Sequence, residues 1–327
     1  MTQTPRILKL ENMTHRALNA LNPKKTIVIA AISPIEVHGP HLPTGQDLFE
    51  ANALLERTAQ KAVEKWPDWT ILATPPLPIG CDTLPHLGSI NYPAPLVRDI
   101  AYYTLRPFAK RGFARLAYSS FHGGPRHFLA LEDAADKLSR RYNVAAISFF
   151  SVVAARMMES NFFHDAVKDS SATDITLAEI EKDLHAGFTE TSIGLHLWPE
   201  LVEDGWDSLE ALVSGDGAED PHKELLVGSS SKTDLVTTLR KVASGVSAVA
   251  AAIKHYKKYT YAGYPGKASA ESGRLLFEHL VGIVSGIVDE FMVKGRKMDV
   301  HSPIWGLREG FLSPPVNTVL DEWLHLF

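Results

Sequence analysis

The sequence has very little cysteine and no long apolar segment. Cys81 is its single cysteine among 327 residues, so a disulfide within the chain and a thiolate metal cluster are both excluded. The longest apolar runs, at residues 26–32 and 280–288, are far shorter than the ~20 residues that a membrane-spanning helix needs. Residues 1–11 hold no apolar run of signal-peptide length. We therefore expect a soluble, cytoplasmic protein in a reducing compartment.

An excess of positive charge is also lacking. The chain has 33 Lys and Arg against 38 Asp and Glu, which gives a formal net charge of -5, and no block of like charges stands out. Domains that bind nucleic acid carry a basic patch, so no nucleic-acid partner is expected. With 45% hydrophobic residues the composition is that of an ordinary globular protein with a large core. A small-molecule substrate is the favoured kind of partner.

Apolar runs alternate with helical periodicity along the first half of the chain. Four runs rich in β-forming residues predict buried strands, at residues 26–33, 70–75, 114–120 and 143–152. Apolar residues recur at helical spacing between them, over residues 47–65, 96–111 and 126–142. This alternation with short connections predicts βαβ units. The expected fold is an α/β sandwich with a mostly parallel central sheet flanked by helices.

The pattern changes after about residue 160. Residues 161–183 are polar and indicate an excursion from the sheet, whereas helices are expected at residues 189–202, 233–256 and 268–293. Ser269 is a suitable N-cap for the last of these helices. We interpret residues 1–299 as one domain and residues 300–327 as a C-terminal extension that packs on the body or on a neighbouring subunit.

The most informative segment, I-E-V-H-G-P-H-L-P-T-G-Q-D at residues 35–47, directly follows the first predicted strand. Sites in open α/β sheets gather at the carboxyl ends of strands. Glu36 and His38 are two residues apart, so an extended segment places both side chains on one face. The glycines and prolines that follow can turn the chain and return Asp47 to this pair. An aspartate between two ligands can bridge two cations. His41 is either a supporting group or simply packed.

A second segment, S-F-H-G-G-P-R-H, ends the third predicted strand. His122 is therefore expected at the same edge of the sheet as Glu36. His127 falls inside the following helix and is expected to be structural. The H-G-G triplet is also typical of the oxyanion loop of lipase-like esterases. That mechanism needs a G-x-S-x-G nucleophile elbow, and the sequence contains none.

A third segment, H-A-G-F-T-E-T-S, carries His185 in a loop and Glu190 in the first turn of a predicted helix. A carboxylate in that position is favourable against the helix dipole even without a function. Taken alone, Glu190 is therefore better explained as a residue that stabilises the helix start than as a ligand.

Together and in this order, the three segments resemble the motifs of the creatininase family, the creatinine amidohydrolase-like metalloenzymes. Softer features of that family also match, namely P-L-P-I-G at residues 76–80, L-G-S-I at 87–90, R-G-F at 111–113 and A-S-A-E-S-G at 268–273. The similarity covers roughly residues 8 to 293. It implies a single α/β sandwich, often assembled into hexamers, so a homo-oligomer is expected.

The resemblance also implies a dinuclear site held by five side chains, Glu36, His38, Asp47, His122 and Glu190. Asp47 would bridge two divalent ions, with Glu36 and His122 completing the first ligand set. His38 and Glu190 would complete the second. Carboxylate and imidazole ligands suit Zn, Mn or Fe. A water activated by both ions would be the nucleophile, and His185 matches the histidine that the family is proposed to use for proton transfer.

The chain departs from the family pattern beside these positions. Ser33 and Pro34 replace a glycine-serine pair, Ser120 and Phe121 replace asparagine and glycine, and Pro125 replaces an asparagine. Family members that act on creatinine use tryptophans in the segment before H-A-G, and residues 150–184 contain none. Those members also have a glutamate where this chain has Gly124. We therefore expect a substrate other than creatinine.

Three hypotheses follow. The leading one is hydrolysis of an amide or cyclic amide C–N bond in a small molecule by metal-activated water. The second is hydrolytic ring opening of a cyclic ketone or lactone derived from a sugar or cyclitol, which the ligands cannot distinguish from the first because water attacks a carbonyl in both. The third is a non-catalytic, metal-stabilised binding protein that has kept the fold and lost turnover.

Overall fold

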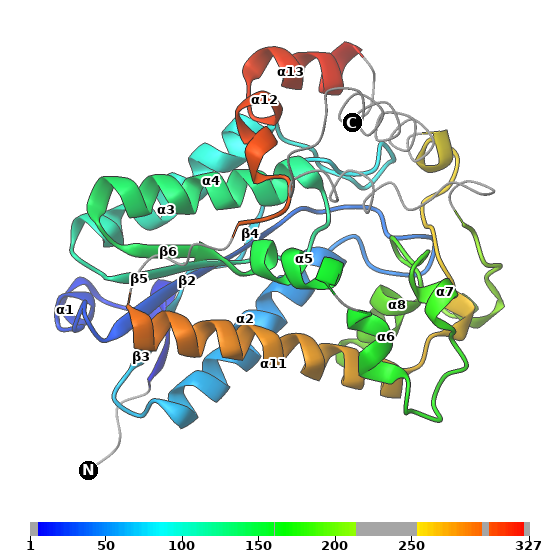
Figure 1. Cartoon of the computed structure of the whole chain (residues 1–327), viewed down its shortest axis with the longest axis horizontal. Helices are drawn as coiled ribbons and strands as arrows, with labels where there is room; N and C mark the ends of the chain where they lie inside the picture. Colours follow the sequence, from blue (N-terminus) through cyan, green and yellow to red (C-terminus); the bar gives the residue numbers. More distant parts are fainter. Residues whose placement is uncertain (1–5, 160, 214–253, 296–300, 324–327) are drawn as a thin grey trace.

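The computed structural model describes residues 6–159, 161–213, 254–295 and 301–323 (Figure 1). A six-stranded sheet lies at the centre of this part of the chain. Its strand order is β1-β3-β2-β5-β6, with β4 paired to β2, and neighbouring strands are parallel throughout. The expected α/β sandwich with a mostly parallel central sheet is therefore confirmed.

The described strands are β1 (Ile7–Lys9), β2 (Thr26–Ser33), β3 (Thr70–Ala73), β4 (Leu77–Pro78), β5 (Arg115–Ser119) and β6 (Ala145–Ser148). Every residue of the central strand β2 is buried, as expected for a strand covered on both faces. The prediction of strand over residues 143–152 was wrong at its end. β6 stops at Ser148 and α5 (Phe149–Glu159) begins at the next residue. A continuous apolar run does not distinguish a buried strand from a buried helix.

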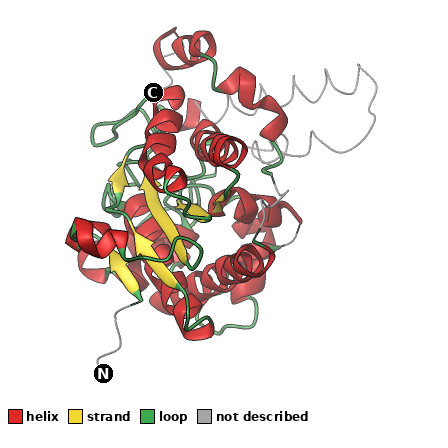
Figure 2. Ribbon diagram, turned by 90° about the vertical axis from the view of Figure 1, so that its left-hand side faces the viewer, coloured by secondary structure: helices red, strands yellow, loops and turns green. Residues whose placement is uncertain are grey.

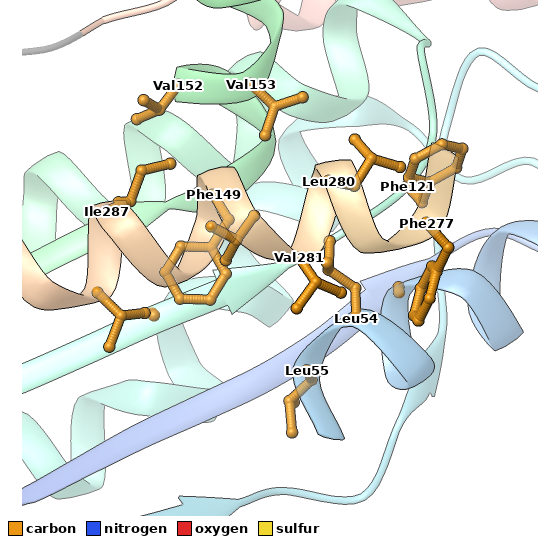
Figure 3. Close-up of a cluster of buried hydrophobic side chains, with 14 of the residues drawn as sticks. Leu54, Leu55, Phe121, Phe149, Val152, Val153, Phe277, Leu280, Val281 and Ile287 are labelled. Atoms are coloured by element: carbon orange, nitrogen blue, oxygen red, sulfur yellow. The ribbon is translucent and has the colours of Figure 1, made fainter. Parts of the chain in front are cut away.

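Helices cover both faces of the sheet (Figures 1 and 2). One face carries α3 (Ala94–Lys110) and α4 (Pro125–Tyr142), and the other carries α2 (Gln46–Lys65) and α11 (Ala270–Lys294). Alternate residues of β2 enter the two cores that result, because successive side chains of a strand point to opposite faces. Figure 3 shows part of the core beneath α11, where Leu54, Phe149, Val281 and Ile287 lie among the buried apolar side chains.

Shorter helices occupy the rest of the described chain. They are α1 (His15–Asn19), α6 (Phe162–Val167), α7 (Leu177–Ile180), α8 (Phe188–Leu197), α12 (Arg308–Phe311) and α13 (Pro314–Thr318). Single 3-10 turns lie at Leu10–Asn12, Pro199–Leu201, Trp206–Ser208, Pro265–Lys267 and Trp305–Leu307, and a π-helical turn at Val319–Trp323. Of the helix expected over residues 233–256, residues 254–256 are helical and the others lie outside the described residues. Within the described ranges, none of the helices combines the length and apolarity that crossing a membrane requires.

The start of α11 packs very closely against α8, the helix that carries Glu190. Ser269 caps α11 as predicted, since its side chain accepts a hydrogen bond from the amide of Ser272. At Gly273, a Cβ atom would lie 1.8 Å from the carbonyl oxygen of Ser192 and 2.4 Å from its carbon. A side chain at this position can be accommodated only if the backbone of α8 moves.

We expect Gly273→Ala to lower the free energy of unfolding by about 3 kcal/mol, because overpacking here pushes two helices apart. Urea denaturation measures the change. Gly282→Ala on the same helix is the matched control, since Gly282 is exposed and a Cβ atom there would meet no described atom of another element within 4 Å. Alanine there should stabilise the protein slightly. Equal effects of the two substitutions would contradict the packing argument.

Candidate metal centre

The segment after β2 folds back on itself and brings Asp47 to Glu36. The amide of Glu36 donates a hydrogen bond to the carbonyl of Thr44 at 2.9 Å. This hydrogen bond closes a loop that contains Gly39. Gly39 has a φ of 65°, a left-handed conformation that favours glycine. Asp47 then falls in the first turn of α2, where the helix dipole favours a carboxylate.

The structure brings together all five side chains for which metal ligation was predicted. His122 Nδ1 lies 3.1 Å from Glu36 Oε2 and 3.0 Å from Asp47 Oδ2. His38 Nε2 lies 3.2 Å from Asp47 Oδ1 and 3.7 Å from Glu190 Oε2. Asp47 thus presents one oxygen to each histidine. Its carboxylate joins two groups of candidate ligands, in each of which the donor atoms lie within 4.8 Å of one another.

The atoms that face the centre of this cluster are buried and poorly hydrogen-bonded. Glu36, His38 and Asp47 are at most 1% exposed. Within the described part of the chain, Glu36 Oε2, His38 Nε2 and Asp47 Oδ2 have no hydrogen bond of standard geometry. Buried polar atoms left in this state cost free energy. Divalent cations between them would satisfy these atoms and neutralise the carboxylates, so the residues fit such ions.

The outer atoms of the same side chains are held by the backbone. His38 Nδ1 donates to the carbonyl of Glu36, and His122 Nε2 donates to the carbonyl of Cys81, both at 3.0 Å. Glu36 Oε1 accepts a hydrogen bond from the amide of Leu84 at 2.6 Å. Each imidazole therefore turns its other nitrogen toward the carboxylates. Histidines that bind metal ions are oriented in this way.

Burial and charge act in opposite directions on the titration of these groups. Burial alone would lower the pKa of His38, but Asp47 and Glu190 outweigh it and raise the pKa to about 10. Burial also opposes the charge on His122, yet Glu36 and Asp47 raise its pKa well above the ordinary value. Burial would raise the pKa of Asp47, and the two histidines hold it far below its usual range. The cluster therefore favours positive charge at its centre.

His185 lies beside the cluster, in the loop before α8. Its ring centroid is 4.3 Å from that of His38. Its Nε2 donates to the carbonyl of Val37 at 2.8 Å, which leaves Nδ1 as the ring atom that can accept a proton. Glu36, His38 and His185 also form a third group close enough to hold a cation. The geometry permits both a proton-carrying role and a ligand role, so the predicted role of His185 stays a prediction.

Asp183, which sequence analysis missed, holds the start of α8 in place. This partly buried carboxylate accepts hydrogen bonds from the amides of Phe188 at 2.6 Å and Thr189 at 2.8 Å. A Cβ atom on Gly187 would lie 1.9 Å from Asp183 Oδ1, which explains the glycine of the H-A-G segment. An acidic residue shortly before a predicted helix is the signal that could have identified it. Glu190 depends on this support because it lies in the same first turn.

We expect Asp183→Ala to lower the free energy of unfolding by about 2 kcal/mol, because it leaves buried amides without an acceptor. Thermal or urea denaturation measures the loss. Asp165→Ala is the control, since that exposed aspartate forms a surface ion pair with Lys168 and should change stability by less than about 0.5 kcal/mol. A loss for Asp183→Ala no larger than that of the control would refute the capping role.

Glu50, one helical turn after Asp47, was also missed. Its Oε1 accepts a hydrogen bond from Gln46 Nε2 at 2.9 Å, and the same nitrogen donates to the carbonyl of Glu190 at 3.1 Å. Burial raises the pKa of Glu50 well above its ordinary value, and the charges of Glu190 and Asp47 act in the same direction. The neutral carboxyl is therefore favoured. A polar residue on a mostly apolar helix face gives no sequence signal that separates it from an ordinary surface residue.

The other two histidines of the motifs are held by hydroxyl groups. His41 Nε2 lies 2.7 Å from Thr191 Oγ1, on the first turn of α8. His127 Nε2 lies 3.0 Å from Ser120 Oγ, and burial together with His122 lowers the pKa of His127 to about 3. A buried, neutral His127 fits the structural role that was predicted for it.

Comparison with known proteins identifies relatives in both sequence and structure. The 3-dehydro-scyllo-inosose hydrolase of Thermotoga maritima is 24% identical over 208 residues, which is 62% of this chain and 60% of that enzyme's length. A crystal structure of creatinine amidohydrolase (creatininase) superimposes with a TM-score of 0.57 at 17% identity, and covers 87% of this chain and 98% of that one. Creatininase in an Mn form and a mutant of Zn–Zn type give TM-scores of 0.54 and 0.56, at 18% and 15% identity and the same coverage. These likenesses establish the fold.

The family is established by a more direct match. The model of the creatininase (creatinine amidohydrolase) family matches residues 11–288, which is most of the chain and includes all three motifs. The extension after residue 300 lies beyond this match. The chain therefore belongs to the creatininase family of hydrolases.

Proposed function

We propose that this protein hydrolyses a small molecule at a carbonyl carbon, using two divalent cations held by Glu36, His38, Asp47, His122 and Glu190. The observation that carries the proposal is the position of the Asp47 carboxylate, whose two oxygens face two different histidines. Each histidine also faces a second carboxylate. The Mn and Zn–Zn forms of creatininase support Zn or Mn as the metal. When bound, such ions supply Lewis acidity, which activates water and polarises a carbonyl group.

In this proposal the chain's own residues orient the two histidine ligands and transfer protons. The backbone carbonyls of Glu36 and Cys81 fix the rings of His38 and His122, so that neither imidazole needs to reorient during the reaction. His185 is tethered through Nε2 to the carbonyl of Val37, and its Nδ1 would take up a proton and return it to the leaving group.

A C–N amide or cyclic amide bond is the leading candidate for the bond that is broken, as in the name of the family. Creatinine itself is not the proposed substrate. A Cβ at Gly124 would lie 2.5 Å from His122 Nε2 and 2.7 Å from the Cβ of Asp82. The backbone here therefore leaves no room for the glutamate that creatinine-hydrolysing members have at this position. The segment 150–184 also supplies no tryptophan to hold the flat ring.

A cyclic ketone or lactone derived from a cyclitol or sugar is the second candidate. It is favoured by the relative that is named as a hydrolase of 3-dehydro-scyllo-inosose. Attack of water on a carbonyl is common to both candidates, and they differ in the leaving group. Amide hydrolysis releases an amine that must be protonated, whereas opening of a carbocyclic ketone breaks a C–C bond.

A substrate panel tests the proposal. The full chain, loaded with Zn²⁺ or Mn²⁺, is incubated with creatinine, other cyclic amides, lactones and cyclitol ketones, and the products are identified by mass spectrometry. We expect a mass gain of one water for a compound other than creatinine. Amine release identifies the leading candidate, and acid without amine identifies the second. Stoichiometric metal with no hydrolysis of any compound would overturn the proposal and indicate the non-catalytic binding protein.

A further inference from the structure

The loop after β4 holds two of the proposed ligands by their outer atoms. The carbonyl of Cys81 accepts from His122 Nε2, and the amide of Leu84 donates to Glu36 Oε1. Asp82 lies between them with a φ of 65°, in the left-handed region that residues other than glycine rarely adopt. Such a conformation persists only where the surrounding structure holds it. The orientation of His122 therefore depends on what holds Asp82.

Arg126, at the start of α4, donates two hydrogen bonds to the carboxylate of Asp82. Its Nε donates to Asp82 Oδ1 at 2.5 Å and its backbone amide donates to Oδ2 at 2.6 Å. Arg126 is only 3% exposed, although its side chain is charged. A buried guanidinium needs acceptors for its remaining donors as well, because leaving a buried charge unpaired is strongly destabilising.

The C-terminal extension supplies those acceptors. Asp321 Oδ1 accepts from Arg126 Nη2 at 2.7 Å, and Asn317 Oδ1 accepts from Nη1 at 3.0 Å. Asn317 also accepts from the amide of Ala94 at 3.2 Å, which ties the extension to the start of α3. Helices α12 and α13 lie on the outer side of α4 (Figure 1). Both acceptors lie beyond the part of the chain that the family model matches.

We infer that the C-terminal extension is a positioning element for the metal centre, in which Asn317 and Asp321 hold Arg126. Arg126 in turn holds Asp82, and the adjoining Cys81 carbonyl orients His122. The inference rests on the proposed function, since it takes His122 to be a ligand. Loss of a group that orients a ligand typically weakens metal binding by about 10–100-fold. The loss should fall on the site of Glu36 and His122, because the loop's hydrogen bonds to the centre reach these two side chains.

Asp321→Asn in the full-length protein tests the inference, since it keeps the size of the side chain and removes its charge. Metal-free protein is titrated with Co²⁺ against a competing chelator, and the visible absorption of bound Co²⁺ reports the geometry of each site. The variant Glu190→Gln weakens Co²⁺ binding at the second site, so the absorption signal that it leaves unchanged is assigned to the first site. We expect the affinity of the first site to fall about 10-fold and its absorption to change. The second site should stay within about two-fold of wild type.

Ser302→Ala is the matched control within the extension. Ser302 Oγ donates to Glu132 Oε2 on α4 at 2.6 Å, an anchor that does not involve Arg126. This variant should lower Tm and leave both Co²⁺ affinities unchanged. Arg126→Lys should reproduce the loss of Asp321→Asn, because one ammonium group cannot replace the separate contacts of Nε, Nη1 and Nη2 to Asp82, Asn317 and Asp321.

Unchanged affinities in both Asp321→Asn and Arg126→Lys would overturn the inference, and so would equal losses in Ser302→Ala and Asp321→Asn. The same titration separates this result from failure of the proposed function. If the wild-type protein binds no Co²⁺, the metal centre itself is refuted rather than the role of the extension.

Discussion

Asp47→Ala is expected to abolish the binding of both metal ions and all hydrolysis. One oxygen of Asp47 faces His38 and the other faces His122, so the substitution removes a donor from each ligand group. It also leaves two buried imidazoles without the carboxylate that compensates them. Metal content after dialysis, measured by inductively coupled plasma mass spectrometry, should fall to background, and turnover of any substrate from the panel should fall with it.

Glu50→Gln is the matched control on the same helix. Burial favours the neutral form of Glu50, and glutamine closely resembles that form in size and polarity. This variant should therefore retain the metal content of the wild type. Normal metal content in Asp47→Ala would contradict the bridging role of this residue. Loss of metal in both variants would show that the measurement reports general disruption of α2 rather than the loss of a ligand.

His185→Ala is expected to retain both metal ions and to lower kcat by roughly 10²–10⁴-fold, the range typical of a lost general acid or base. The tether from its Nε2 to the carbonyl of Val37 places the ring beside His38 with one nitrogen left to exchange protons. Steady-state kinetics and metal analysis of the same preparation measure the two quantities separately.

His255→Ala serves as the control for His185→Ala. His255 likewise bonds a backbone carbonyl, that of Tyr261, at 2.9 Å, but it belongs to none of the candidate ligand groups in the described structure. Its kcat should stay within about two-fold of wild type. Unchanged turnover in His185→Ala would remove that residue from the mechanism. Loss of metal would assign it instead to the ligand group of Glu36 and His38.

The sequence predicted the strands and helices that pack most fully. β2 was predicted with its observed bounds because a parallel strand buried on both faces appears as an unbroken apolar run. Helices α2, α3 and α4 were predicted to within two residues at each end from their apolar periodicity. β1 was missed because its three residues become a strand only by pairing with β3, a tertiary contact that no local pattern encodes. The boundary between β6 and α5 was missed because both are apolar.

In the candidate site, too, residues in local sequence motifs could be predicted, whereas groups brought in by tertiary packing could not. Glu36, His38, Asp47 and His122 belong to short motifs at strand ends, and the parallel pairing of β2 with β5 brings those ends together. The groups that hold these side chains in place were not predicted. The carbonyl of Cys81 and the amide of Leu84 are backbone atoms, which almost every residue type provides.

The support from the extension could not be predicted either. Arg126 and Asp321 are 195 positions apart in the sequence, and their contact depends on how the extension crosses α4. A charged residue at the start of a helix is ordinarily solvated, so nothing local indicates that Arg126 is buried. Long-range contacts of this kind require the packed structure.

Anomalous diffraction from crystals of the metal-loaded protein tests the central claim most directly. Data are recorded on both sides of the absorption edge of Zn or Mn. We predict two anomalous peaks, one on each side of the Asp47 carboxylate, the first beside Glu36 and His122 and the second beside His38 and Glu190. A map with no peak in contact with Asp47 would contradict the account.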